Sequence, residues 1–213
     1  MTRARTRMGL LLARSQLTLA RQGRELLEQK RDALLREFYR NVEIVFAAHG
    51  ELEAATGAAR LALESARVRL GSEAVAAAAT AAVGELTVDV DWASVMGVPV
   101  PIVAPRRLVR TPDGRGRSVD ASGPALELAA ERFEEALTIA VRVATLEARV
   151  RRLAREIRRT SSRVTALRAR VIPRLEAEVA AAALVLEQRE REDRFRLKRV
   201  KASRARRSTH PVA

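Results

Sequence analysis

Two long stretches of this chain repeat their apolar residues at alternating spacings of three and four, and this pattern restricts the fold more than any other feature. The first stretch runs from Leu10 to about Leu70 and contains no proline. Its repeating positions are Leu10, Ala13, Leu17, Ala20, Leu27, Leu34, Phe38, Val45, Ala48, Leu52, Ala55, Ala59, Ala62 and Ala66, interrupted by Arg24, Arg31 and Asn41. At about 1.5 Å per residue, the pattern predicts one helix roughly 90 Å long.

The second stretch begins at Pro124, a residue suited to the first turn of a helix, and continues to about Val200. Its repeating positions are Leu126, Ala129, Phe133, Leu137, Ala140, Val150, Leu153, Ile157, Thr160, Val164, Leu167, Val171, Leu175, Val179, Ala182 and Leu186. Pro173 lies inside this stretch, and we expect a helix bend there because proline removes a hydrogen bond and clashes with the preceding turn. Two such stretches predict a mainly α protein, a long antiparallel two-helix left-handed coiled coil.

The segment between the two stretches has a different pattern. Residues 71–84 are rich in alanine and predict a short helix. Apolar and polar residues then alternate from Leu86 to Trp92, which is typical of a strand. Val98–Val103 is apolar but contains two prolines, which suits an edge strand or an extended segment. Residues 111–114 (Thr-Pro-Asp-Gly) predict a turn. We therefore expect a small β-hairpin-containing head that caps the end of the coiled coil.

These patterns divide the chain into four parts. Residues 1–70 form the N-terminal helix, 71–121 the head, 122–202 the C-terminal helix and 203–213 a flexible basic tail. Aromatic residues make up only 3% of the chain, which favours long packed helices over the core of a compact enzyme.

The sequence offers no constellation for catalysis, a cofactor or a metal ion. There is no cysteine, and His49 and His210 are the only histidines. Asp89 and Asp91 share the solvent face of the predicted strand, with no base or metal ligand beside them. No run of 18 apolar residues is present, so we expect no segment inserted in a membrane.

The net charge of +14 is concentrated at the two ends of the chain. Residues 1–24 carry six arginines and no acid, and residues 189–213 carry ten basic residues against three acids. One hypothesis is a basic coiled-coil adaptor that binds nucleic acid through phosphate contacts. The scarcity of aromatic residues near these charges disfavours it, because base-stacking modules need them.

Several segments of the chain have a distinctive sequence. In the first half they are Thr6-Arg7, Lys30-Arg31-Asp32 and Val95–Pro101. In the second half they are Arg163–Leu167, Val171–Pro173, Leu186–Asp193 and Phe195–Lys201. Together these segments resemble the D subunits of the V-type and A-type rotary ATPases. The chain departs from the family at Thr165 and Arg168, where Asn and Glu are usual.

The resemblance implies a non-catalytic central rotor component without a cofactor. Its partners would be the nucleotide-binding A and B subunits, the F subunit, and the collar subunit (C/d) on the proteolipid ring, with no nucleic acid. The complex would lie at the cytoplasmic face of the membrane and couple ATP synthesis or hydrolysis to proton or sodium transport.

Under this resemblance, two groups of residues are candidate contact sites. The contacts with the catalytic hexamer would be Arg7, Arg14, Arg21, Arg189, Arg191, Arg194 and Arg196. The contacts with the F subunit and the collar would be Trp92, Met96 and Val98.

Overall fold

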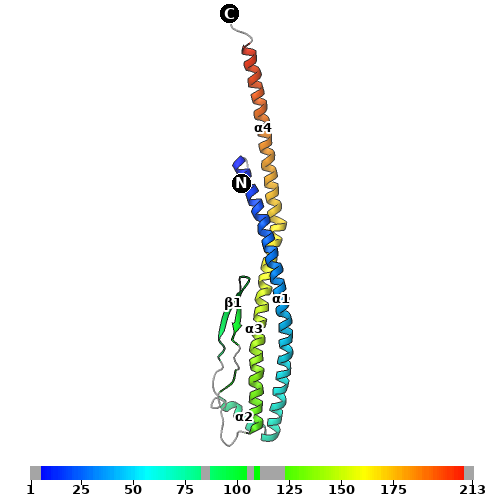
Figure 1. Ribbon diagram of the computed structural model, residues 1–213, viewed down its shortest axis with the longest axis vertical. Helices are drawn as coiled ribbons and strands as arrows, with labels where there is room; N and C mark the ends of the chain where they lie inside the picture. The colour runs from blue at the N-terminus through cyan, green and yellow to red at the C-terminus, as the bar shows by residue number, and fades with distance from the viewer. Residues whose placement is uncertain (1–5, 83–86, 105–107, 111–122, 209–213) are drawn as a thin grey trace. The chain divides into compact units, whose positions relative to one another are not determined.

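The computed structural model describes residues 6–82, 87–104, 108–110 and 123–208 (Figure 1). Its elements are α1 (Arg7–Leu70), α2 (Ser72–Ala81), β1 (Val90–Val95), β2 (Val98–Val103), α3 (Pro124–Ala166), the π-helical segment η3 (Leu167–Val171) and α4 (Ile172–Ser208). The mainly α fold, with a long helix pair and a small antiparallel hairpin in mid-chain, is confirmed. Two compact units divide the chain: residues 1–31 with 159–213, and residues 32–158.

In the unit formed by residues 32–158, α1 and α3 pair in opposite directions. Glu37 of α1 bonds Arg149 of α3, and Glu51, further along α1, bonds Arg142, which comes earlier in α3. The partner's number falls as the number in α1 rises, which is the mark of an antiparallel pair.

The predicted seam of α1 in this unit is confirmed. The buried residues of α1 fall on the predicted positions and are Leu34, Asn41, Ala48, Ala59, Ala62 and Ala66.

The α3 side of the seam differs from the prediction in two places. Phe133 and Leu137, expected at the seam, are exposed, and Ala136 is buried instead. Seven residues further along, Val143 is buried, whereas the predicted Ala140 is only partly buried. The facing part of α1 is lined by alanines, so the helices approach closely there and a small side chain fits where a bulky one does not.

The hairpin has a two-residue turn, Met96-Gly97, between Val95 and its partner Val98. Both turn residues have positive φ, 52° and 80°, which defines a type I′ turn. The predicted strand from Leu86 begins only at Val90, and residues 87–89 are not in a strand. The expected strand at Val98–Val103 is confirmed as β2. The expected turn at 111–114 and Leu86 itself lie outside the described residues.

The position of the hairpin corrects the expectation that it caps the helix pair. Val98 and Val100 pack against Leu34 of α1 and Leu153 of α3, far from the end of α1 at Leu70. The hairpin therefore lies along the flank of the pair, as Figure 1 shows for β1 beside α3. A strand pair with one apolar face needs a long apolar surface, and the flank offers it.

The short helix α2 is what lies near the end of α1. Val75 of α2 packs against Ala62 and Ala66 of α1 and Ala129 of α3. The predicted helix in the alanine-rich segment is therefore confirmed, and it buries its one large apolar residue against the last turns of α1.

In the unit formed by residues 1–31 and 159–213, the start of α1 pairs with α4, again in opposite directions. Arg7 bonds Glu190 and Arg21 bonds Glu176, each at 2.6 Å. α4 continues to Ser208, so residues 203–208 of the predicted tail are helical.

The π-helical segment η3 absorbs an irregularity in the heptad pattern of this unit. The spacing from Leu167 to Val171 to Leu175 is four and then four, so one residue more than the heptad allows is present. In η3 the Ile172 N–H donates to the Leu167 carbonyl, five residues back. As a result Val171, expected at the seam, is 39% exposed, and Ile172 takes its place at 7%. The bend expected at Pro173, directly after this turn, stays a prediction.

Candidate functional site

The candidate residues for the catalytic hexamer lie on α1 and α4 in the unit formed by residues 1–31 and 159–213. All seven are exposed: Arg7, Arg14, Arg21, Arg189, Arg191, Arg194 and Arg196. Arg7 and Arg21 form ion pairs from α1 to α4, and Arg191 pairs with Glu187 one turn earlier in its own helix. These three arginines stabilise the helices as well as contributing positive charge to the surface.

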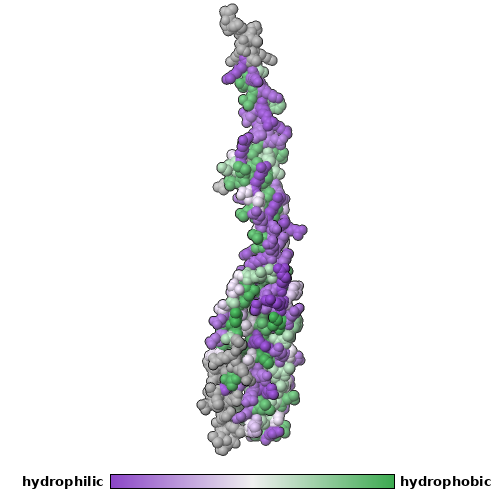
Figure 2. Space-filling view, in the orientation of Figure 1, coloured by the Kyte–Doolittle hydropathy of each residue, from purple (hydrophilic) through white to green (hydrophobic). Residues whose placement is uncertain are grey.

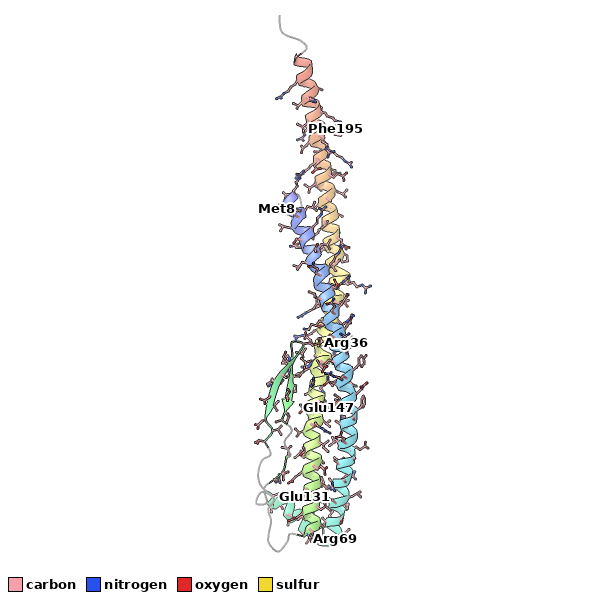
Figure 3. The ribbon with its side chains drawn as sticks, in the orientation of Figure 1. Met8, Arg36, Arg69, Glu131, Glu147 and Phe195 are labelled. Atoms are coloured by element: carbon pink, nitrogen blue, oxygen red, sulfur yellow. The ribbon has the colours of Figure 1, made fainter. Side chains whose placement is uncertain are left out.

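The last part of α4 has no helix beside it among the described residues. Because Glu190 faces Arg7 at the first turn of α1, residues 191–208 run past the start of α1, by about 27 Å at the rise of an α-helix. Every residue from Arg191 to Arg204 is exposed, including Phe195, Leu197 and Val200. Figure 3 shows Phe195 on this single helix beyond Met8.

Exposed apolar residues near the start of α1 are a feature that the sequence reasoning missed. Met8, Leu11, Leu12 and Leu19 are each more than half exposed. Their signal is in the sequence, because a 24-residue segment with this many leucines has more of them than one narrow seam can bury.

The candidate residues for the F subunit and the collar have different environments in the hairpin. Trp92 is more than half exposed, but the Arg152 guanidinium of α3 stacks over its ring at 4.3 Å from the centroid. The same Arg152 donates a hydrogen bond to the Pro99 carbonyl at 3.2 Å. Trp92 therefore helps to hold the hairpin on α3 and leaves only part of its surface free.

Met96 and Val98 differ from each other although they are two residues apart. Met96 lies in the turn, is half exposed and has a positive φ, which residues other than glycine rarely adopt. Val98 is only 5% exposed and belongs to the core cluster with Leu34 and Leu153. Because it faces the helices, it offers little surface to a partner, and its role as a contact residue stays a prediction.

A polar cluster lies in the seam between α1 and α3. Asn41, which is buried, donates hydrogen bonds to the Glu37 carbonyl at 2.6 Å and to the Glu37 carboxylate at 2.9 Å. Arg40 and Arg149 bond the same carboxylate at 2.6 and 2.8 Å. Burial raises the pKa of Glu37, but the hydrogen bonds from Asn41 and Arg40 and the charges of Arg40 and Arg149 outweigh it, so its pKa is lowered.

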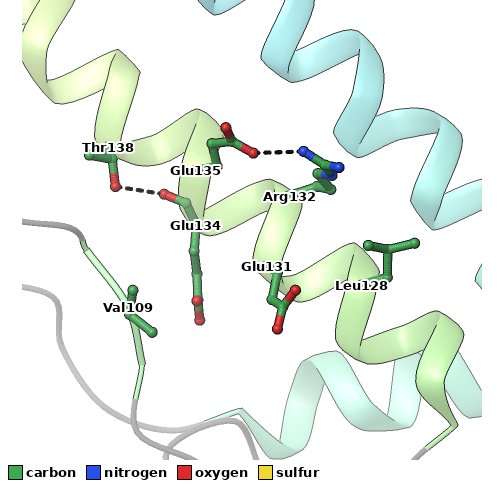
Figure 4. A pocket seen from close by; sticks show the side chains of 7 residues that line it. All are labelled: Val109, Leu128, Glu131, Arg132, Glu134, Glu135 and Thr138. Carbon is green, nitrogen blue, oxygen red and sulfur yellow. Dashed lines mark hydrogen bonds and ion pairs between the residues drawn. The ribbon is translucent and has the colours of Figure 1, made fainter.

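A shallow pocket of about 350 Å³ lies beside α3 (Figure 4). It is lined by Val109, Leu128, Glu131, Arg132, Glu134, Glu135 and Thr138. Backbone N–H groups bind two of these side chains: that of Leu108 donates to Thr138, and that of Arg110 to Glu134. These two bonds attach residues 108–110 to α3, so Thr138 and Glu134 have a structural role in the pocket. The lining contains no base–nucleophile pair.

The part of the chain that the structure describes contains no group of three or more His, Asp or Glu side chains placed to hold a metal ion. Within the same residues, no helix is both long and apolar enough to cross a bilayer.

Comparison with known proteins identifies the family. The family model for the D subunit of ATP synthase matches residues 9–202. The chain is 42% identical to the D subunit of a V-type ATP synthase from Anaeromyxobacter sp. (strain Fw109-5), covering 95% of this chain and 94% of the relative. It is 39% identical to the D subunit of an A-type ATP synthase from Thermococcus kodakarensis, with 92% of each chain covered. It is 42% identical to the D subunit of a V-type ATP synthase from Thermus thermophilus, over 92% of this chain and 86% of the relative. The chain therefore belongs to the family of ATP synthase D subunits.

Proposed function

We propose that this protein is the non-catalytic central shaft of a V/A-type ATP synthase. It transmits torque between the ion-translocating ring in the membrane and the catalytic hexamer, so that ATP synthesis or hydrolysis is coupled to proton or sodium transport. Its partners are the A and B subunits of the hexamer, the F subunit and the collar subunit, at the cytoplasmic face of the membrane.

The observation that carries this proposal is the part of α4 from Arg191 onward, which runs past the start of α1 and is exposed throughout its described side chains. A helix without a packed neighbour is only marginally stable in water, and the exposed Phe195, Leu197 and Val200 on this one are typical of a surface that a partner covers. A surrounding sleeve of partner subunits would cover it, and its arginines would attract acidic loops without one strong contact that locks rotation.

The helix pairs supply the stiffness that a shaft needs. In both units ion pairs join the two helices across the seam, at Arg21–Glu176 in one and at Glu37–Arg149 in the other. Exposed pairs such as the first contribute at most about 1 kcal/mol each, so the stiffness rests mainly on the buried seam.

The hairpin is the surface that we assign to the F subunit and the collar. Met96 at its turn and the free part of Trp92 project from the flank of the α1–α3 pair, whereas Val98 holds the hairpin in place.

Helical turns of the π type frequently occur at functional positions, and η3 next to Pro173 would make the shaft asymmetric in cross-section.

The experiment is co-assembly of the purified chain with the A–B catalytic hexamer, measured by light scattering after size exclusion. We expect one copy per hexamer. A variant that ends at Glu190 removes only residues without a neighbouring helix, so its α1–α4 pair still folds and it should lose most of its binding.

A variant with Leu61→Ser, exposed on α1 in the other unit, is the matched control and should bind normally. No complex, or several copies per hexamer, would refute the shaft. If the chain instead bound nucleic acid, and this binding weakened steeply as the salt concentration was raised, the basic adaptor would be favoured.

A further inference from the structure

Three exposed leucines form a line along the first part of α1. Leu12, Leu19 and Leu26 are 55%, 69% and 64% exposed, and their separation of seven residues puts them on one face of the helix. Figure 3 places Met8 at the start of this helix, and Figure 2 shows hydrophobic side chains on the surface in the same part of the molecule. The three leucines belong to the unit formed by residues 1–31 and 159–213.

The line of leucines lies on the side of α1 that is turned away from α4. Arg21 bonds Glu176 of α4 at 2.6 Å, so Arg21 marks the side of α1 that faces that helix. Leu19 comes two residues earlier, and two residues turn an α-helix by about 200°. Leu12 and Leu26, each seven residues from Leu19, share its position around the helix.

The surface around these leucines is almost free of charge, although 31% of the chain is charged. The charged residues between positions 8 and 30 are Arg14, Arg21, Arg24, Glu25, Glu28 and Lys30. Arg14 and Glu28 are seven residues from Arg21 and share its side of the helix. Arg24 is partly buried and forms an ion pair with Glu28. Only Glu25 and Lys30 border the leucines, and they are one acid and one base.

The residues on this surface read nearly the same in both directions from Leu19. Three and four residues away on each side there are one glutamine and one small residue, and seven residues away there is a leucine. We call this set the leucine face: Leu12, Ser15, Gln16, Leu19, Gln22, Gly23 and Leu26. Two antiparallel copies related by a two-fold axis need a self-complementary surface of this kind, whereas a different partner does not. The symmetry of the leucine face therefore selects a second copy of this chain as its occupant.

An antiparallel pair with its axis at Leu19 brings the leucines together. A residue that comes a given number of places before Leu19 lies level with the residue that comes as many places after it in the second copy. Leu19 then packs against Leu19 of the second copy, and Leu12 against its Leu26. A parallel pair would instead place the basic ends of both copies side by side, which is unfavourable.

The polar residues of the leucine face also fit the antiparallel pair. Gln16 comes opposite Gly23 of the second copy, and Gln22 opposite its Ser15, so each long side chain meets a small one. Apart from the backbone of its own turns, no atom of the described residues lies within 4 Å of the position that a Cβ on Gly23 would take. The space above this glycine is therefore open to the glutamine of a second copy.

We propose that the free chain pairs with a second copy of itself through the leucine face, as two antiparallel α1 helices centred on Leu19. The contact from Leu12 to Leu26 is only about 21 Å long, which is short for a stable dimer. The dissociation constant should therefore lie in the micromolar range. Because the two copies repel each other through their net charge, raising the salt concentration should strengthen the pair.

The pairing bears on how the complex assembles. It covers apolar side chains that are otherwise exposed on the free chain. One chain joins each hexamer in the proposed function, so a pair has to separate before either copy becomes a shaft. The inference rests on the proposed function in this last point alone.

The first test uses cysteine cross-linking, because the natural chain has no cysteine. The full-length chain with Leu19→Cys is oxidised with copper–phenanthroline at about 50 μM, above a micromolar dissociation constant. We expect a disulfide-linked dimer, since the axis brings the two thiols together. Leu12→Cys and Leu26→Cys should each cross-link slowly alone and fast when the two variants are mixed.

The matched control is Leu61→Cys, which is 74% exposed on α1 in the other unit and reports random collision. Leu19→Cys should cross-link at least about tenfold faster, because the pair holds its thiols at a high effective concentration. Equal rates for these two variants would overturn the inference. So would fast cross-linking of Leu12→Cys to itself, which is the mark of a parallel pair.

The second test measures the dissociation constant of the otherwise unmodified chain by sedimentation equilibrium. Leu19→Glu places two carboxylates against each other at the axis, and we expect it to weaken the pair at least about tenfold. Leu61→Glu makes the same change of charge away from the leucine face and should change the constant by less than about twofold. Circular dichroism checks that both variants keep their helices. A natural chain that stays monomeric, or an unchanged constant for Leu19→Glu, would refute the inference.

These tests are separate from the test of the proposed function. If one copy joins each hexamer and the free chain is monomeric, the shaft stands and the pairing fails. If the free chain pairs at Leu19 but forms no complex with the hexamer, the pairing stands and the shaft fails.

Discussion

The π-helical segment η3 should be energetically coupled to Pro173, and a double-mutant cycle can measure the coupling. In a regular α-helix a proline costs about 3 kcal/mol, because it lacks an N–H and its ring clashes with the carbonyl four residues back. The π turn η3 ends two residues before Pro173 and is wider than an α-helical turn, so we expect the Ala169 carbonyl to lie farther from the proline ring than in a regular helix. The two features should therefore relieve each other.

The perturbation is deletion of Ala169, which removes the extra residue and lets the heptad run without interruption from Leu167 to Leu175. In the natural sequence this deletion places the proline in a regular helix, and we expect it to destabilise the α1–α4 pair by about 3 kcal/mol. In the Pro173→Ala background the same deletion should be neutral or stabilising. The expected coupling energy is therefore about 3 kcal/mol.

Pro173→Ala alone should leave the π turn in place. Without that turn Ile172 would leave the seam, and exposing an isoleucine costs about 2 kcal/mol before any later seam residue is counted. The measurement is amide hydrogen exchange over residues 160–190, which reports local opening of this pair, and the deletion of Ala181 serves as a control that adds a new irregularity. Additive effects of the two changes would refute the reasoning.

Three further predictions concern the unit formed by residues 32–158. Met96→Gly should stabilise the hairpin by about 1 kcal/mol and Gly97→Ala should destabilise it by a similar amount, because both positions have positive φ. Melting temperatures check this, and a shift in the same direction for both variants would contradict it. The stability of this unit should fall as pH drops from the ordinary pKa of glutamate, about 4.5, through the lowered pKa of Glu37, and Glu37→Gln should flatten that part of the curve in urea titrations. Asn41→Leu should retain helix content but loosen the pairing of α1 with α3, seen as altered disulfide cross-linking between engineered cysteines, while an unchanged pattern would rule out a role in register.

The helices and most of their seam could be predicted from the sequence because the buried positions of a coiled coil recur every seven residues along the chain. Leu34, Ala48 and Leu153 are buried where the spacing put them. The exchange of Val171 for Ile172 could not be located, because two successive spacings of four reveal an extra residue but not the turn that absorbs it.

The hairpin shows a second limit of the sequence. Alternation identifies the apolar face of a strand, but the surface that covers this face is chosen by tertiary packing, and here it is the flank at Leu34 and Leu153 rather than the end of the helices. The burial of Val98 could have been found, since a two-residue turn at Met96-Gly97 pairs Val98 with Val95 and puts both on one face. The contact roles predicted for the arginines of α1 and α4, and for Trp92, Met96 and Val98 in the hairpin, stay predictions.

The two prolines of β2 make the two edges of the hairpin differ in their capacity to pair with a further strand. In a hairpin with a two-residue turn, Pro99 and Pro101 face Ser94 and Trp92 at the positions that exchange no bonds with β1, so neither proline costs a ladder bond. The missing N–H groups are those that would point outward from β2, and the Pro99 carbonyl is already occupied by Arg152. β-Augmentation by an extended peptide is thus blocked at β2 and left to β1, where Trp92 and Ser94 still present their outward amides.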